Sequence, residues 1–320
     1  MSIKKASKEK LNLHPRNKNR ERYDLDAMTV AVPELLDYIQ PNKLGKNSIN
    51  FSNPTAVKTL NKAILHYYYG IKYWEFPDEN LCPPIPGRAE YIHHAADLLS
   101  ENNMGKILRG KNITCLDIGT GATCVYPIIG VAEYNWNFIG SDISLKSIKS
   151  AQNIIHSNPS LKGKVSCRLQ NQPKSIFRGI IHQEDKIDIS ICNPPFHSSI
   201  EEAEKGTRRK VKNLTGKKVN APKLNHSGNK NELIYKGGEL QFISNMIAES
   251  KAMAKHCFWF SSLVSKESNL KKIYKILGKN KPSEMKTIDI TTGNKTSRIV
   301  AWTYLTPKEK RSWQENKHHQ

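Results

Sequence analysis

Four consecutive residues, Asn193-Pro194-Pro195-Phe196, combine hydrogen-bond acceptors with an aromatic ring. The Asn193 side chain offers an amide oxygen. The prolines fix the local backbone and carry no N–H, so the Pro194 carbonyl is rigidly aimed. Phe196 adds a flat apolar face of the kind on which unstacked bases stack. Two acceptors beside a stacking ring suit a planar group that bears an NH₂, so we expect these four residues to be catalytic.

A buried strand must position this tetrapeptide. Residues 187–192 are rich in isoleucine and end at the two prolines, which cannot continue a central strand. In an open α/β sheet, ligands bind at the carboxyl ends of the strands. A Pro-Pro pair could also do no more than end a strand, and a second motif favours the catalytic interpretation.

The second motif is a glycine-rich turn, Asp117-Ile118-Gly119-Thr120-Gly121, at the end of an apolar run that starts at Ile113. Glycines at a strand-to-helix turn let the backbone approach a ligand, and the helix N-terminus supplies N–H groups. A dinucleotide site would require a third glycine where this chain has Cys124. The motif therefore favours an S-adenosylmethionine site with Asp117, Gly119 and Gly121 as cofactor-binding residues.

A second strand-like run, 138–143, contains an acid, Asp142, 23 residues after Gly119. A carboxylate at that position can accept hydrogen bonds from both ribose hydroxyls. Asp142 could instead cap the next helix, as could Ser144. The chain order of strand, glycine turn, helix, strand with acid, helix, strand 165–169 and strand with Asn-Pro-Pro-Phe is the order of a doubly wound methyltransferase sheet.

Further patterns predict the remaining elements. Helices are expected at 31–39, at 54–71 (one apolar face: Val57, Leu60, Ile64, Tyr67 and Ile71), at 88–99, at 238–253 and at 270–277, and strands at 257–263, 285–290 and 298–305. The predicted fold is α/β: a Rossmann-like class I methyltransferase with a doubly wound, mostly parallel seven-stranded sheet and an antiparallel last strand. A small helical N-terminal extension is added to it.

Three regions follow from this organisation. We predict a basic arm and helical RNA-binding extension at 1–87, a methyltransferase domain at 88–306 with a basic loop at 197–236, and a frayed polar tail at 307–320. The Pro- and Gly-rich run after Cys82 marks the first boundary.

The charge distribution points to a polyanionic partner. The chain of 320 residues has 50 Lys and Arg against 29 Asp and Glu, a net charge of +21. Residues 1–22 and 197–236 each carry a net charge of +6, and we expect both to be mobile until they meet phosphates. A solvated tail is the alternative for the first. The RNA-binding candidates are Lys10, Arg16, Lys18, Arg20, Arg208, Arg209, Lys210 and Lys217.

Other classes of protein are disfavoured. The mean hydropathy of −0.60 and the lack of a long apolar run argue against a membrane span, and Met1 is not followed by a secretory signal. The six cysteines never form C-x-x-C, and the histidine pairs lack ligand spacing, so neither disulfides nor a metal is expected. We expect a cytoplasmic monomer.

The motifs together resemble the bacterial 23S ribosomal RNA adenine-N6 methyltransferase family RlmF and its eukaryotic methyltransferase-16-like relatives. The resemblance extends from about residue 10 to residue 306. It rests on Leu13-His14-Pro15-Arg16-Asn17, CPPIPGRAEYI from Cys82, DIGTGATCVYPIIG from Asp117, Asn193-Pro194-Pro195-Phe196-His197, Gly237-Gly238-Glu239-Leu240 and Ser297-Arg298.

The resemblance implies a function and a set of site residues. It implies methylation of N6 of an adenine in 23S rRNA, adenine 1618 by the family's target, with S-adenosylmethionine as cofactor. By match to the family's motifs, Arg88, Gly119, Thr123 and Asp142 contact the cofactor, and residues 193–196 contact the target base. Thr123 and Asp142 replace the serine and glutamate of eukaryotic members, and each keeps the hydroxyl or carboxylate.

The residues alone leave other functions open. The same tetrapeptide serves enzymes that methylate guanine N2, cytosine N4 or a protein glutamine, because each substrate presents a planar NH₂. An RNA-binding protein on an inactive methyltransferase scaffold is a further possibility. Free rRNA and an assembling large subunit are both possible substrates.

Overall fold

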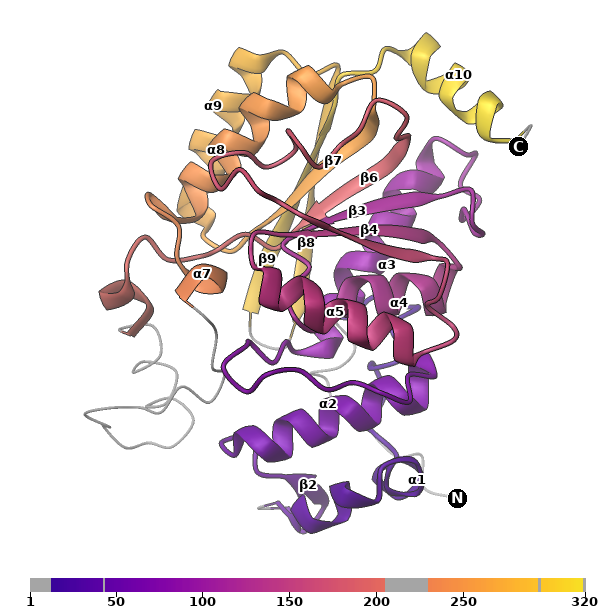
Figure 1. Cartoon of the computed structure of the whole chain (residues 1–320), viewed down its shortest axis with the longest axis vertical. Coiled ribbons are helices and arrows are strands. Elements are labelled where there is room, and N and C mark those ends of the chain that lie inside the picture. Colours follow the sequence, from indigo (N-terminus) through magenta and orange to yellow (C-terminus); the bar gives the residue numbers. More distant parts are fainter. Residues whose placement is uncertain (1–12, 43, 205–229, 293–294, 319–320) are drawn as a thin grey trace.

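The computed structural model describes residues 13–42, 44–204, 230–292 and 295–318. A seven-stranded sheet forms its centre (Figure 1). The strand order is β5-β4-β3-β6-β7-β9-β8. Its strands are β3 (Thr114–Ile118), β4 (Asn137–Asp142), β5 (Val165–Leu169), β6 (Ile187–Cys192), β7 (Cys257–Val264), β8 (Glu284–Thr292) and β9 (Lys295–Thr303).

The direction of the strands confirms the predicted topology. The strands from β5 to β7 are parallel, and β9 runs antiparallel to both β7 and β8. The chain leaves β3 for β4 and β5 on one side and then returns to β6 on the other. This reversal between β3 and β6 is the switch point where open α/β sheets bind ligands.

Helices cover both faces of the sheet, as the fully buried central strands require. One apolar cluster joins buried residues of α2 (Pro54–Tyr69), α3 (Ile85–Glu101), α4 (Val125–Tyr134) and α5 (Leu145–Ser157). The other joins those of α8 (Gly238–Ser250), α9 (Leu270–Asn280) and residues 176–181. Every residue of β6 is buried, so the tetrapeptide that follows it starts from a rigid base.

The N-terminal extension differs from prediction at its first element. The expected helix at 31–39 is wrong: α1 (Leu25–Ala31) ends before Pro33, a 3₁₀ turn covers Pro33–Tyr38, and Ile39 enters a hairpin of β1 (Ile39–Pro41) and β2 (Asn47–Ile49). Proline cannot continue the preceding helix because it lacks the N–H. The next helix, α2, is confirmed, although Tyr67 lies on its exposed side.

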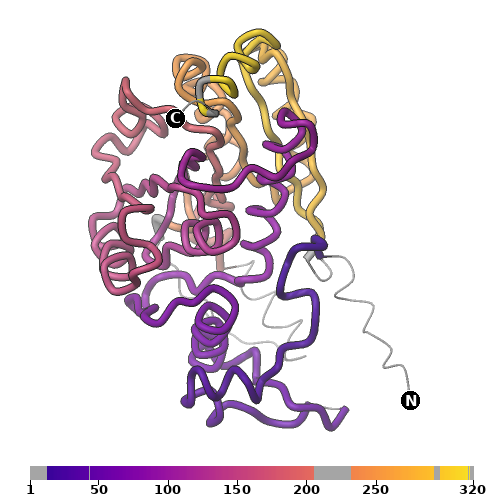
Figure 2. Tube along the Cα trace, turned by 90° about the vertical axis from the view of Figure 1, so that its right-hand side faces the viewer, coloured from indigo at the N-terminus to yellow at the C-terminus, as the bar shows by residue number. Residues whose placement is uncertain are grey.

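Residues 13–22 are packed against the sheet domain, so the prediction of a mobile arm is wrong for them. Figure 2 shows this indigo segment running up from the extension. The His14 N–H and the Asn17 side chain both donate to the buried carboxylate of Glu90 on α3, at 2.8 and 2.6 Å. A buried carboxylate must be hydrogen-bonded, which fixes the segment. Residues 1–12 lie outside the described part of the chain.

The C-terminal residues form a helix, α10 (Pro307–His318), and the prediction of a frayed tail is wrong. The Trp313 indole donates to Asp188 Oδ1 at 2.9 Å, and the Lys317 ammonium pairs with the other oxygen. Asp188 is buried on β6. The helix therefore neutralises an acid on the same strand that carries the tetrapeptide. Across the described ranges, no helix is long and apolar enough to cross a membrane.

Candidate active site

The glycine-rich turn between β3 and α4 has the backbone that the sequence predicts. Gly119 and Gly121 have φ angles of 75° and 66°, in the left-handed region where a side chain is strained. The N–H groups of Gly119 and Thr120 each donate to the Ser141 carbonyl at 2.9 Å. The turn is thus fixed to the end of β4, the strand that carries Asp142.

Asp142 lies beside this turn at the end of β4. Its carboxylate accepts from the Gly121 N–H at 3.1 Å and from the Ser144 N–H at 2.8 Å. Burial raises the pKa of Asp142, and these backbone hydrogen bonds oppose the rise. Ser144 is the cap of α5, because its hydroxyl accepts from the Ser147 N–H. Asp142 therefore does not cap α5, and its carboxylate lies beside the glycine-rich turn.

The tetrapeptide follows β6 directly. Its residues Asn193 and Pro195 line a pocket that the glycine-rich turn and Asp142 also line. The Asn193 Oδ1 atom is buried, and within the described ranges it has no hydrogen-bond partner. Pro194 is buried, and Phe196 is half-buried and outside the pocket lining. An unsatisfied buried acceptor carries a free-energy cost of about 1–3 kcal/mol, which a protein keeps where a ligand will satisfy it.

A pocket of about 240 Å³ brings together seven of the ten predicted catalytic and cofactor-binding residues. Those at its surface are Arg88, Gly119, Gly121, Thr123, Asp142, Asn193 and Pro195. The Arg88 guanidinium lies 5.4 Å from the centre of the Tyr126 ring, a cation–π contact that holds it at the wall. The glycine turn, the acid and the tetrapeptide, far apart in sequence, meet here.

Asp117 is the exception among the predicted cofactor residues. It is fully buried and does not line the pocket. Burial raises the pKa of Asp117 to about 7, and the interaction with the Thr120 side chain and the positive charge of Arg88 oppose this rise. The structure therefore places Asp117 behind the glycine turn, where it does not reach the pocket.

Sequence reasoning missed several pocket residues, among them Tyr126, Glu232, Ile234 and Tyr235. Tyr126 follows the glycine turn on α4, where the apolar sequence pattern predicts a core residue. The other three lie in the region expected to be a mobile basic loop. The one available signal was an acid, Glu232, in an otherwise basic stretch before Gly237.

Of the predicted RNA-binding residues, the structure describes three. The Arg16 guanidinium donates to Tyr134 Oη at 2.9 Å and to Asp97 Oδ1 at 2.6 Å, and its contact with RNA stays a prediction. Lys18 pairs with Glu133 at 3.0 Å, and Arg20 is half-buried. The remaining candidates lie outside the described residues: Lys10, Arg208, Arg209, Lys210 and Lys217.

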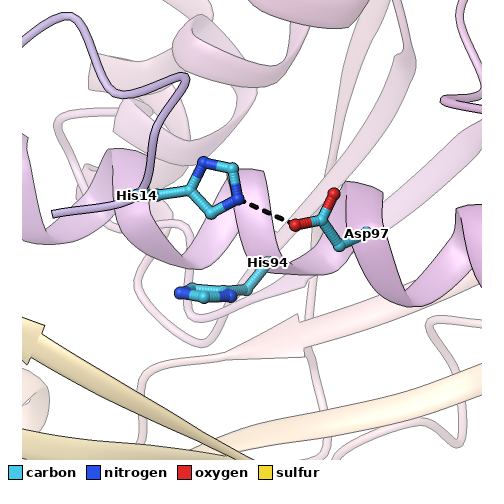
Figure 3. A group of neighbouring side chains, drawn as sticks. All are labelled: His14, His94 and Asp97. Carbon is cyan, nitrogen blue, oxygen red and sulfur yellow. Dashed lines mark hydrogen bonds and ion pairs between the residues drawn. The ribbon is translucent and has the colours of Figure 1, made fainter.

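The fold also brings together three potential metal ligands that sequence spacing did not reveal. Atoms of His14, His94 and Asp97 lie within 4.8 Å of one another (Figure 3). The Arg16 N–H donates to His14 Nδ1, so the His14 proton resides on Nε2, which faces Asp97 Oδ2 at 2.8 Å. A metal would need the lone pair of that nitrogen. The group is therefore a hydrogen-bond network that anchors the N-terminal segment.

The pKa of Asp97 agrees with this interpretation. Burial alone would raise it, but hydrogen bonds from His14 and Arg16 hold it below its usual value. The carboxylate is thus already compensated by protein donors. An adjacent guanidinium also disfavours a bound cation.

Comparison with known proteins gives a consistent result. The RNA methyltransferase family model Methyltransf_10 matches residues 7–306. The ribosomal RNA large subunit methyltransferases F of Yersinia enterocolitica and Photobacterium profundum are 49% and 47% identical to this chain. The alignments cover 96% and 98% of this chain and 92% and 97% of those proteins.

A solved structure is similar over most of the chain. The catalytic domain of hMettl16, in complex with the MAT2A 3′UTR hairpin 1, matches with a TM-score of 0.78 and 26% identity. The match covers 92% of this chain and 96% of that one. With a family model that covers nearly the whole sequence and relatives near half identity, the chain belongs to the RNA methyltransferase family.

Proposed function

We propose that this protein uses S-adenosylmethionine to methylate N6 of an adenine in 23S rRNA. The observation that carries the proposal is the buried Asn193 oxygen, which has no partner in the described chain and lines the pocket beside the glycine turn. An acceptor in that position fits an incoming NH₂ group. The names of the close relatives and the net charge of +21 support ribosomal RNA as the partner.

The pocket fits the proposed cofactor. The glycine turn offers a close-approaching backbone for the methionine end, and Asp142 offers a carboxylate for the ribose hydroxyls. Arg88 and Thr123 complete the wall. When bound, S-adenosylmethionine supplies a methyl group on a positively charged sulfur. The chain's own residues must then present a nucleophile in line with that methyl.

Asn193 and Pro194 would prepare that nucleophile. The amine of adenine is a poor nucleophile because its lone pair is delocalised into the ring. Hydrogen bonds from its two N–H groups to the Asn193 side chain and the Pro194 carbonyl favour the pyramidal form, whose lone pair is free. These bonds strengthen as positive charge develops on nitrogen, so they stabilise the transition state more than the substrate.

The target base must leave its stack to reach this site. Unstacking costs a few kcal/mol, and stacking on an aromatic face returns roughly 1–3 kcal/mol. Phe196 follows the acceptors directly, but its ring lies outside the pocket lining. We propose that it turns toward the base when RNA binds.

The wider setting follows from the substrate. Methyl transfer from a sulfonium needs no metal, and we propose a monomer that works without one. Ribosomal RNA as substrate implies a cytoplasmic location. The hMettl16 domain was solved with an RNA hairpin, which supports a structured RNA as the partner here.

A labelled-donor assay separates this proposal from its rivals. The protein is incubated with methyl-labelled S-adenosylmethionine and total RNA or total protein from cells that lack it. Label in RNA, and its loss with Asn193→Ala, is expected. Label in protein would favour a glutamine substrate, and no transfer despite cofactor binding would favour an RNA-binding scaffold.

A further inference from the structure

Residues 233–235 lie against the end of the tetrapeptide. The His197 N–H donates to the Leu233 carbonyl, and the Tyr235 N–H donates to the His197 carbonyl, both at 3.0 Å. These bonds form a parallel bridge between His197 and Ile234. His197 follows Phe196 directly, so the segment is attached to the loop that carries Asn193.

Glu232 ties the other side of this segment to the N-terminal extension. It lies in the short helix α7 (Lys230–Leu233). Its Oε1 accepts from Asn80 Nδ2 at 3.0 Å, and its Oε2 accepts from the Leu81 N–H at 3.1 Å. Asn80 is only 3% exposed and Glu232 is half-buried, so the contact is partly shielded from water. The two bonds join positions about 150 residues apart in sequence.

This contact stands at the cofactor pocket. Glu232, Ile234 and Tyr235 line the pocket from one side, and Leu81 lines it as well. Glu232 Oε1 lies 3.9 Å from where a side chain on Gly121 would begin, so the carboxylate faces the glycine turn. The segment 232–235 therefore connects the tetrapeptide, the glycine turn and the extension.

We propose that Glu232 is a positioning residue that holds residues 232–235 at the pocket and so makes cofactor binding depend on residues 80–81. The inference rests on the proposed function, because it takes the pocket to be the S-adenosylmethionine site. Glu232 affects cofactor binding through residues 232–235, which it holds at the pocket. The tetrapeptide at 193–196 and the cofactor pocket are then held together by one contact.

The chemistry of the pair explains why a carboxylate is required. Asn80 Nδ2 and the Leu81 N–H are both donors, and each meets a separate oxygen of Glu232. A glutamine would place an NH₂ opposite the Asn80 NH₂, and the Asn80 amide would have to turn its oxygen toward it, which restores a hydrogen bond without the charge. An aspartate at position 80 would place an acceptor opposite an acceptor, with two like charges. Hydrogen bonds to charged groups are the stronger ones, so either change should be measurable.

A swap of the two side chains tests this directly. In the double variant Glu232→Gln with Asn80→Asp, the glutamine oxygen can accept from the Leu81 N–H while its NH₂ donates to the aspartate. Titration calorimetry with S-adenosylmethionine gives the Kd, and steady-state transfer to 23S rRNA separates KM from kcat. Glu79→Gln is the matched control, since Glu79 is exposed and adjacent to Asn80.

Asn80→Asp alone should raise the cofactor Kd and KM at least tenfold while kcat at saturation stays within threefold. Glu232→Gln should shift them in the same direction by a smaller factor. The double variant should return to within threefold of the unmodified protein, and Glu79→Gln should not differ from it. A general packing role predicts no such return.

Either of two results would overturn the inference. The single variants could bind cofactor as the unmodified protein does, or the double variant could be no better than the singles. Should Asn80→Asp not fold, Glu232→Gln and the double variant still decide between these outcomes. Absence of S-adenosylmethionine binding to the unmodified protein would instead refute the proposed function, and this inference with it.

Discussion

Replacement of Asn193 by alanine should abolish most methyl transfer without weakening the protein. The Asn193 oxygen is buried and accepts no hydrogen bond within the described ranges, so its removal breaks no internal acceptor contact. Relief of an unsatisfied acceptor is worth about 1–3 kcal/mol, which offsets the packing lost with a small, half-buried side chain. We expect the free energy of unfolding to change by less than about 1 kcal/mol.

The effect on catalysis should be much larger. Loss of one preorganised hydrogen bond to a developing charge typically lowers kcat by about 10²–10³, or roughly 3–4 kcal/mol. The Kd for S-adenosylmethionine should stay within about threefold, because Asn193 is expected to meet the target base. Single-turnover transfer to 23S rRNA measures the first quantity, and calorimetry measures the second.

Asn61→Ala is the matched control. Asn61 is also a buried asparagine, but its amide donates to Cys82 Sγ at 3.2 Å and to the Pro83 carbonyl at 3.0 Å. Its removal should cost about 1–3 kcal/mol of stability, because buried acceptors lose their donor. If Asn193→Ala lost stability and cofactor affinity as well, Asn193 would be a structural residue. The proposal that its oxygen accepts a hydrogen bond from the target NH₂ group would then be refuted.

Three further predictions concern the elements around the site. Gly121→Ala should lower the free energy of unfolding by roughly 1–2 kcal/mol in urea unfolding, since φ is 66° there and a left-handed residue costs that much; Gly278→Ala in α9, where φ is not positive, should not lower it. Burial raises the pKa of Asp117 from 3.8 to about 7, so between these values the folded protein holds a proton that the unfolded chain has released, and stability falls as pH rises to 7. Asp117→Asn does not titrate, so the Tm of the variant minus the Tm of the unmodified protein, measured by calorimetry, should increase from pH 5 to pH 7.5. A Tm difference that stays constant over this range would contradict the burial argument. Ending the chain at residue 306 should cost about 3–5 kcal/mol in urea unfolding, because buried Asp188 loses both partners from α10, whereas ending it at residue 318 should cost nothing measurable.

The strands and the two motifs were predictable because their signals are local. The glycines at 119 and 121 mark a backbone that other residues adopt only with strain, and the paired prolines fix where β6 must end. The order of these motifs then determined the topology, since parallel strands joined by helices have few arrangements. The prediction of the sheet, including its antiparallel strand, was confirmed in this way.

Sequence reasoning fell short where a residue's contacts depend on a distant partner. Arg16 lies in a basic stretch, and only the position of Asp97 on α3 shows that its guanidinium is paired within the protein. The helix α10 is polar overall, and its order depends on Asp188, a buried acid in a strand far away in sequence. Glu232 reads as one charge among many until the fold places Asn80 beside it.

The packing of residues 13–22 has the same cause. Asn17 is a polar residue in a charged segment, which favours solvent in a local reading. In the structure, Glu90 is buried on α3, and its carboxylate needs donors that the N-terminal segment supplies. Burial raises the pKa of Glu90, and the hydrogen bonds from Asn17 and His14 oppose that rise.

The most direct test of the central claim is the identity of the methylated nucleoside. The purified protein would be given methyl-labelled S-adenosylmethionine and 23S rRNA from cells that lack it, and the RNA would then be digested to nucleosides for mass spectrometry. Label is expected in N6-methyladenosine, and none with Asn193→Ala. Label in a methylated guanosine or cytidine would contradict the adenine assignment, and label absent from RNA but present in protein would contradict the proposed function as a whole.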